Sequence, residues 1–229
     1  MRLAREAPKH NPIGMNAAVK ILLLVVGLFV AAIVIVGIWV WSTYNGLVGL
    51  EQATDAQWAQ VQNVYQRRAD LVPNLVNTVS GAANFEKSTL IAVTDARASV
   101  GRVQLPSGSA PTDASQLAAF DQAQGQLGAA LSRLLVVSEN YPQLTATASF
   151  RDLQAQLEGT ENRIAVERGR FNDAVQAYDV AIKQFPAVLI AGAFGHTPRP
   201  YFTAAAGAQT APSVNFNFGN SAAPGGASH

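Results

Sequence analysis

Hydrophobic residues first form one unbroken block near the N-terminus of the chain. No charged residue occurs between Ile21 and Trp41. A helix of this length would extend ~31 Å, enough to cross a hydrocarbon core of ~30 Å. Trp39, Trp41 and Tyr44 stand at the end of the block, where aromatic rings favour the membrane–water interface. The pattern therefore predicts one transmembrane helix over residues 21–43.

A cleaved signal peptide is the alternative reading of this block. The hydrophobic core of a signal peptide usually has only ~7–15 residues and is followed by a small-x-small cleavage site. The block here is longer, and the Trp41-Ser-Thr-Tyr44 sequence after it is a poor cleavage site. We therefore favour an uncleaved anchor.

Beyond the anchor, apolar residues recur at alternating steps of three and four, which is typical of helices that bury one stripe. Four such registers span residues 44–72, 76–100, 117–141 and 150–185. Four amphipathic helices with short connections bury their stripes most simply as an antiparallel bundle. The expected fold class is all-α: an N-terminal transmembrane helix followed by an antiparallel four-helix bundle of long helices over residues 44–186.

Proline residues and a linker divide the four helices. Proline lacks an N–H and disfavours helix in the residue before it, so we interpret Pro73 as the first reversal of the chain. The alternative is a kink at Pro73, with the reversal near Asn84. Residues 104–114 are a linker by composition, and Pro142 ends the third register.

Charge changes the picture mainly at the N-terminus. The leader, residues 1–20, holds four basic side chains and one acid, whereas the net charge of the whole chain is only +1. Basic residues are retained in the cytoplasm, so we expect a cytoplasmic N-terminus and an extracytoplasmic bundle. If Met15 is the true start, Lys20 is the only basic side chain left upstream. The near-neutral total argues against a nucleic-acid partner.

Candidate chemistry is sparse. The chain has no cysteine, and its three histidines (His10, His196 and His229) lie outside the four helical registers. We therefore expect no metal site and no cofactor. No motif of a nucleophilic, phosphate-binding or zinc-dependent enzyme is present, and we expect no catalytic residues.

Charged residues inside the apolar stripes are the informative exception. A charge buried alone is costly, so these residues must pair, reach water or line a cavity. Folding the chain back at each turn predicts three groups: Glu51 with Arg97 and Arg168; Glu139 with Arg67 and Arg68; and Glu86 with Thr160, Glu161 and Arg163. We interpret them as ion pairs that fix the helix register. A carboxylate site built on Glu86 and Glu161 is the alternative.

The segment after the bundle, residues 187–202, is apolar but too short to span a membrane. One hypothesis places it at the membrane surface, with five candidate contacts: Leu189, Phe194, Arg199, Tyr201 and Phe202. The alternative is that it folds back and plugs the foot of the bundle. The tail, residues 203–229, is rich in Ala, Gly, Ser and Pro, and a short stretch at 214–218 alternates like a strand.

Several segments together resemble the LemA family: Tyr44-Asn-Gly-Leu-Val48, Gln66-Arg-Arg-Ala-Asp-Leu-Val-Pro-Asn-Leu-Val76, Glu139-Asn-Tyr-Pro-Gln-Leu144, Thr160-Glu-Asn-Arg-Ile-Ala165 and Phe171-Asn-Asp-Ala-Val175. The resemblance covers about residues 20–202. It implies a bacterial single-pass membrane protein with a helical-bundle domain, and it implies no activity. The basic leader and the tail depart from the family pattern.

These observations favour a non-enzymatic scaffold or interaction protein, tethered in the bacterial inner (plasma) membrane. The expected partners are the lipid bilayer, an unknown protein and a second copy of the chain. Self-association would use the bundle and the anchor, where Gly27 and Ala31 allow close approach. The alternatives are an accessory role in a membrane-associated hydrolase or protease system, and a role in membrane remodelling or lipid contact.

Overall fold

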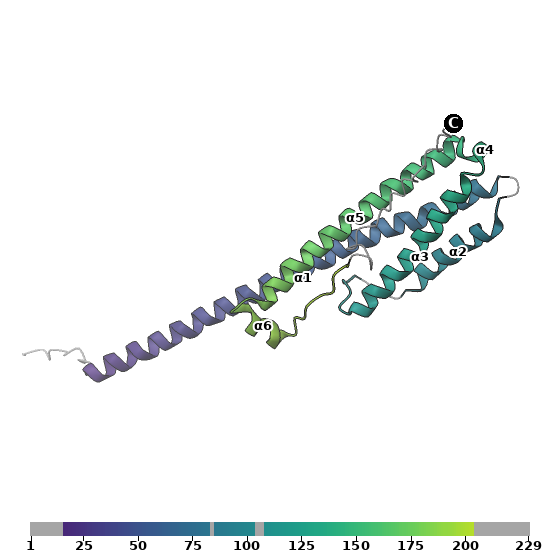
Figure 1. Cartoon of the computed structure of the whole chain (residues 1–229). Helices are drawn as coiled ribbons and strands as arrows, with labels where there is room; N and C mark the ends of the chain where they lie inside the picture. The colour runs from purple at the N-terminus through teal and green to yellow at the C-terminus, as the bar shows by residue number, and fades with distance from the viewer. Residues whose placement is uncertain (1–15, 83–84, 104–107, 204–229) are drawn as a thin grey trace, which may run out of the picture.

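The computed structural model describes residues 16–82, 85–103 and 108–203, and this part of the chain is helical with no strand (Figure 1). The helices are α1 (Ala17–Ser80), α2 (Lys87–Arg102), α3 (Ala114–Ser138), the short α4 (Pro142–Thr145), α5 (Ala148–Lys183) and α6 (Ala187–Phe194). The expected all-α class with an N-terminal apolar helix is confirmed. The leader upstream of residue 16 and the tail beyond residue 203 lie outside the described residues.

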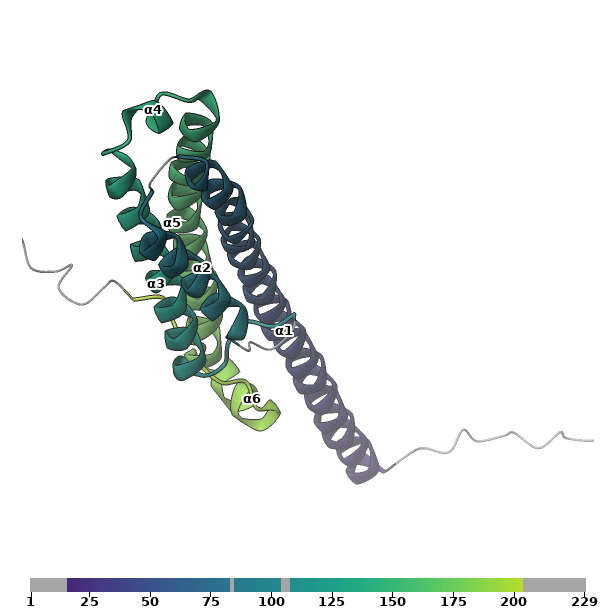
Figure 2. The same ribbon diagram turned by 90° about the vertical axis from the view of Figure 1, so that its right-hand side faces the viewer.

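The helices run up and down beside one another. The second half of α1 lies along α5, while α2 and α3 form a second pair that packs against them (Figures 1 and 2). Buried apolar side chains fill the space between these four helices and α4. They include Val72, Leu75, Val93, Leu127, Leu134 and Phe150. The period of three and four in each register is explained by this shared core.

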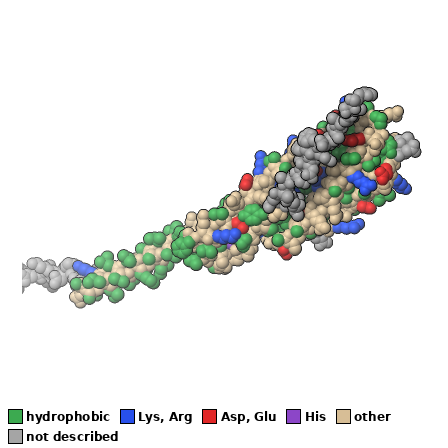
Figure 3. Space-filling model, viewed as in Figure 1, with side chains coloured by type: hydrophobic (Ala, Val, Ile, Leu, Met, Phe, Trp, Pro, Cys, Tyr) green, Lys and Arg blue, Asp and Glu red, His purple; other side chains and the backbone are tan. Residues whose placement is uncertain are grey.

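The anchor and the bundle share one helix. α1 has 64 residues and continues from the apolar block through Tyr44 to Ser80 without interruption. Its N-terminal part is long and apolar enough to cross a membrane and packs against no other described residue. The hydrophobic side chains there are exposed, as expected of a surface that faces lipid (Figure 3).

The predicted reversal at Pro73 is wrong. α1 passes through Pro73 and ends seven residues later, and the chain turns between Ser80 and Lys87. This agrees with the alternative of a later reversal, although Asn84 itself is outside the described residues. Proline at position 73 removes the N–H that would bond to the Ala69 carbonyl. Instead, Arg97 Nε of α2 donates to that carbonyl at 3.0 Å, so the neighbouring helix satisfies the acceptor.

The chain after α6 returns to the bundle. Gly195 has φ +78°, a left-handed conformation that residues with a Cβ rarely adopt, and it turns the chain back. Phe202 is then buried against Trp58 and Phe171, with ring centroids 6.0 and 5.6 Å away. Asn172 holds the Phe202 backbone through two hydrogen bonds of 2.9 Å.

The membrane-surface hypothesis is therefore wrong for Arg199 and Phe202, which are both buried. For residues 196–203 the alternative of a segment folded onto the bundle describes the structure. Leu189 and Phe194 in α6 are exposed, and so is Tyr201. The segment divides because aromatic and ionic partners on α1 and α5 bury its second half, whereas one side of α6 faces outward.

Candidate functional site

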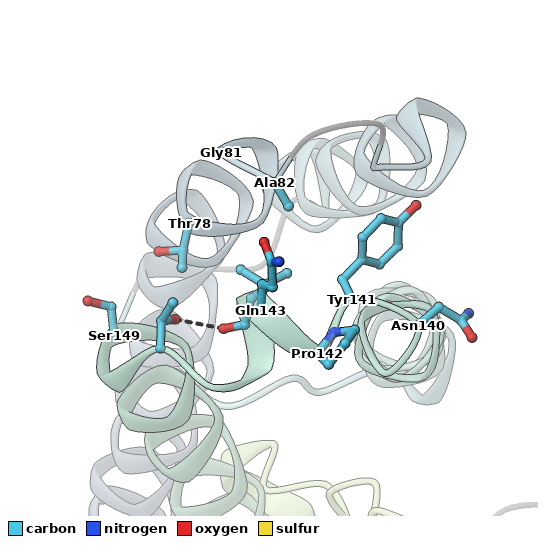
Figure 4. Close-up of a pocket in the computed structure, with 10 residues that line it drawn as sticks. Thr78, Gly81, Ala82, Asn140, Tyr141, Pro142, Gln143 and Ser149 are labelled. Atoms are coloured by element: carbon cyan, nitrogen blue, oxygen red, sulfur yellow. Dashed lines mark hydrogen bonds between the residues drawn. The ribbon is translucent and has the colours of Figure 1, made fainter.

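A cavity of about 730 Å³ lies at the end of the bundle farthest from the anchor. Three parts of the chain surround it: the end of α1 with the turn after it, the α3–α4 connection with α4, and the start of α5. Its lining residues are Thr78, Gly81, Ala82, Asn140, Tyr141, Pro142, Gln143, Leu144, Thr147 and Ser149. We call it the distal cavity. Figure 4 shows Gln143 between the side formed by Thr78 and the side formed by Tyr141.

Local capping interactions build the wall of the distal cavity. Pro142 occupies the first position of α4, where its missing N–H costs no helical hydrogen bond. Thr147 caps α5 by accepting a hydrogen bond from Phe150 N at 3.3 Å, and its hydroxyl donates to the Leu144 carbonyl at 2.7 Å. The Tyr141 ring packs on Phe85 with centroids 5.0 Å apart. The wall is thus fixed by capping hydrogen bonds and ring packing and not by charge.

The distal cavity contains hydroxyl and amide groups and apolar surface, and none of its lining residues is charged. Tyr141 is the one titratable side chain among these lining residues, and no carboxylate, histidine, lysine or arginine lines the cavity beside it to complete an acid–base pair. Among the described residues no group of three or more histidine or carboxylate side chains is placed to hold a metal ion. The chemistry of the cavity suits a neutral, polar ligand that is bound by hydrogen bonds and apolar contact.

Arg68 is the most deeply buried member of the ion pairs that the structure describes. Its side chain is 4% exposed, and Nη1 donates to Glu161 Oε1 at 2.8 Å. Nη2 donates to the backbone carbonyl of Gln124 at 2.9 Å and to its side-chain oxygen. The predicted pairing of Arg67 and Arg68 with Glu139 is wrong, because Arg67 and Glu139 are both exposed and Arg68 faces Glu161.

The predicted sharing of Glu51 by Arg97 and Arg168 is also wrong. Arg168 Nη1 contacts Asp121 Oδ1 at 2.8 Å, and its guanidinium lies 4.4 Å from the centroid of the Phe202 ring. Arg97 bonds to the Ala69 carbonyl. Both errors follow from placing the reversal at Pro73. Arg97 lies beside Ala69, 18 residues along α1 from the predicted Glu51, so the level of α2 differs from the prediction by ~27 Å.

Glu51 instead binds the return segment. Arg199 donates to Glu51 Oε1, and His196 Nδ1 lies 3.3 Å from Glu51 Oε2. Arg199 also donates to the Ala110 carbonyl at 3.1 Å, and its backbone N–H donates to Asp179 at 3.0 Å. Sequence reasoning missed this cluster. The available signal was Pro198 and Pro200 on either side of Arg199, which favour an extended chain that can lie along a helix pair.

The carboxylates of the alternative hydrolase site have different arginine partners. Glu86 accepts a hydrogen bond from Ser88 at 2.6 Å and lies 3.8 Å from Arg133. The Ser88 bond and the charge of Arg133 lower the pKa of Glu86. Glu161 pairs with Arg68. The prediction that Glu86 pairs with Arg163 is wrong, and Arg163 is exposed.

Two tyrosines inside the bundle have altered acidity. Burial raises the pKa of Tyr65, although the nearby Arg168 lowers it in part. Burial also raises the pKa of Tyr178, and the negative charge of Glu51 adds to the effect. Both phenols therefore stay neutral at physiological pH and act as packing and hydrogen-bonding groups.

A family model described as LemA family matches residues 57–216, which is most of the chain. The chain belongs to the LemA family. The resemblance noted in the sequence is thereby confirmed. In this LemA-family protein the segment Glu139–Leu144, one of those that carry the resemblance, supplies five lining residues of the distal cavity.

Among characterised sequences, this LemA-family chain is similar to proteins named as magnetosome proteins. The magnetosome protein MamQ of Magnetospirillum gryphiswaldense is 26% identical, over 87% of this chain and 77% of the relative. The magnetosome proteins MamQ 1 and MamQ 2 of Paramagnetospirillum magneticum show the same identity and the same coverage. These names suggest no catalytic activity. With the apolar helix, they indicate a membrane-associated protein.

Proposed function

We propose that this LemA-family protein is a non-enzymatic scaffold that holds a partner-binding site at a fixed height above the bacterial inner membrane. The observation that carries this proposal is the continuity of α1. The same helix contains the apolar anchor and Thr78 of the distal cavity. A docking site that must reach a partner away from the lipid gains from such a spacer.

The lining of the distal cavity favours a neutral, extended peptide segment of a partner protein as the ligand. Asn140 and Gln143 offer both donors and acceptors, which match the alternating N–H and C=O groups of a peptide backbone. Leu144, Pro142 and Ala82 offer apolar contact for uncharged side chains. A strongly charged ligand would find no opposite charge in this lining.

Site-specific photo-crosslinking in intact cells tests the site. A photoreactive amino acid at Gln143 should form adducts with a partner, and the same group at the exposed Asn162 on α5 should not. Ala82→Trp, which fills the cavity, should abolish the adducts formed from position 143. Equal adduct formation from both positions, or adducts that persist in the filled variant, would count against a docking site.

The proposed orientation places the bundle outside the cytoplasm, because the leader carries the basic surplus. Protease added to intact spheroplasts should then digest the bundle. Protection of the bundle in spheroplasts, with digestion only after lysis, would reverse the orientation.

Self-association is a further part of the proposal. Gly27 and Ala31 lie one helical turn apart on the lipid-exposed part of α1, and helices approach closely at such pairs. Replacing both residues by isoleucine should lower the fraction of the protein that a crosslinker captures as a dimer in membranes. An unchanged dimer fraction would remove the anchor as the contact. The alternative hydrolase role gains no support, since Glu86 and Glu161 pair with separate arginines.

A further inference from the structure

We infer that α6 is a foot that rests on the surface of the bilayer spanned by the anchor. The inference does not depend on the distal cavity, which lies at the opposite end of the bundle. It starts from the composition of α6, Ala187-Val-Leu-Ile-Ala-Gly-Ala-Phe194, which contains no polar side chain. A helix that faces water usually exposes polar residues on its outer side.

Only one side of α6 is covered by the bundle. Ile190 and Ala191 are buried, and Ala191 joins a small core cluster with Leu47 and Tyr178. The outward side exposes Leu189 (65%) and Phe194 (58%), and Phe185 just before α6 is 81% exposed. Three large apolar side chains thus point away from the protein within ten residues of chain.

The position of this surface identifies what covers it. The Phe194 ring packs against Tyr44 with centroids 4.9 Å apart, and Tyr44 follows Trp41 at the end of the apolar block of α1. The exposed side of α6 therefore continues the apolar surface of the anchor at the level where the anchor leaves the lipid. Figure 3 shows hydrophobic side chains along the anchor up to the base of the bundle.

The direction of α6 fits a surface contact and not a second span. The chain bends by 102° between α5 and α6, so α6 lies across the bundle axis (Figures 1 and 2). A helix of eight residues extends only ~12 Å, too short to cross the hydrocarbon core. When the bundle stands on its anchor, α6 lies nearly parallel to the membrane, the geometry of an interfacial helix.

A basic side chain completes the contact. Lys183 in the last turn of α5 is exposed beside the foot, although its Nζ also lies 3.2 Å from Asp179. A lysine stem can lie along apolar surface while its amine reaches a lipid phosphate. The occupant is therefore a bilayer surface with anionic headgroups, the same bilayer that holds α1.

The full chain in lipid nanodiscs of phosphatidylethanolamine and phosphatidylglycerol tests the inference. The sequence has no cysteine, so single cysteines at Leu189, Phe185 and Val136 give unique labels for a polarity-sensitive fluorophore. Val136 is the matched control, because it is an equally exposed apolar residue (63%) at the end of α3 far from the anchor. Helix content by circular dichroism verifies that each labelled chain is folded.

Labels at positions 189 and 185 should emit further to the blue than the label at 136 and be quenched by lipids with a nitroxide near the headgroup. Iodide in the water should quench them at least about threefold less than the label at 136. Iodide quenching equal to that at 136 would overturn the inference. Quenching mainly by nitroxides deep in the acyl chains would overturn the surface contact and show that α6 inserts into the hydrocarbon core. Protection from iodide without quenching by the lipids would overturn the bilayer contact and show that a second copy of the protein covers α6.

Discussion

The contact between Arg97 and the helix around Pro73 leads to a prediction that a double-mutant cycle can test. Proline inside a helix costs ~3 kcal/mol relative to alanine, because a hydrogen bond is lost and the ring meets the carbonyl four residues earlier. In this protein that carbonyl belongs to Ala69 and accepts a hydrogen bond from Arg97 Nε at 3.0 Å. A net gain of ~0.5–1.5 kcal/mol is typical of such a bond.

Pro73→Ala should therefore raise the free energy of unfolding by roughly 1.5–2.5 kcal/mol, the helix penalty less the part that Arg97 already offsets. Pro73 is exposed, so the substitution removes no core packing. Arg97→Ala should lower the free energy of unfolding by ~1 kcal/mol in the wild-type background. In the Pro73→Ala background it should have almost no effect, because the new N–H of residue 73 already satisfies the Ala69 carbonyl.

The measurement is a urea titration of the wild type, the two single variants and the double variant in non-ionic detergent, with circular dichroism as the readout. The expected coupling free energy between positions 73 and 97 is ~1 kcal/mol. Pro142→Ala is the control for proline removal, and it should give no gain because Pro142 occupies the first position of α4. Additive effects of the two substitutions would refute the reasoning, since they would show that Arg97 does not compensate for Pro73.

Three further predictions concern the Arg68 ion pair, the neighbouring Gly128 and the buried Tyr65. Arg68→Ala should cost ~3–5 kcal/mol in a urea titration because it strips the buried Gln124 oxygens of their donor. Glu161→Gln should cost less, ~1–3 kcal/mol, because glutamine keeps an acceptor for Arg68 but leaves its buried charge without an opposite one. Gly128→Ala should stabilise the protein by ~0.5–1 kcal/mol, because alanine favours a helix more than glycine does. The new Cβ would meet only Arg68 Nη1, at an ordinary contact distance of 3.7 Å. Burial raises the pKa of Tyr65, so the contribution of Tyr65 to the free energy of unfolding is complete below pH ~10 and is lost as the pH rises through the folded-state pKa. Tyr65→Phe should therefore reduce the loss of stability at alkaline pH. It should also remove one late step from the absorbance titration of the tyrosines at ~295 nm.

The hydrophobic pattern was sufficient for the elements but not for their lengths. The apolar block from Ile21 predicted the anchor, and the stripes of three and four predicted the long helices. Pro73 was misread because a proline in a pattern indicates a break only when no neighbour compensates. The compensating group, Arg97, is 24 residues away in the sequence. Its role depends on a contact between two helices that no local pattern contains.

The polar residues in the stripes show a similar limit. A charge on a buried stripe predicts that a partner exists, and Arg68 has one in Glu161. The identity of the partner depends on the relative level of two helices, which an error of seven residues in one turn is enough to change. Arg199 could not be placed at all by this reasoning, because it lies in an extended segment without periodicity and its position depends on Glu51 and Asp179.

The uninterrupted α1 has a mechanical consequence. From Tyr44 to Ser80 the helix rises ~54 Å, so the distal cavity lies that far from the point where α1 leaves the membrane. Because α1 is continuous, any tilt of the anchor moves the cavity sideways. Transmembrane helices commonly tilt by ~20°, and a tilt of that size would carry the tip sideways by ~18 Å. A change in the angle of the anchor, whether from bilayer thickness or from a neighbouring helix, is thus amplified into a displacement of the distal cavity that at ~20° exceeds the ~10–12 Å diameter of a helix.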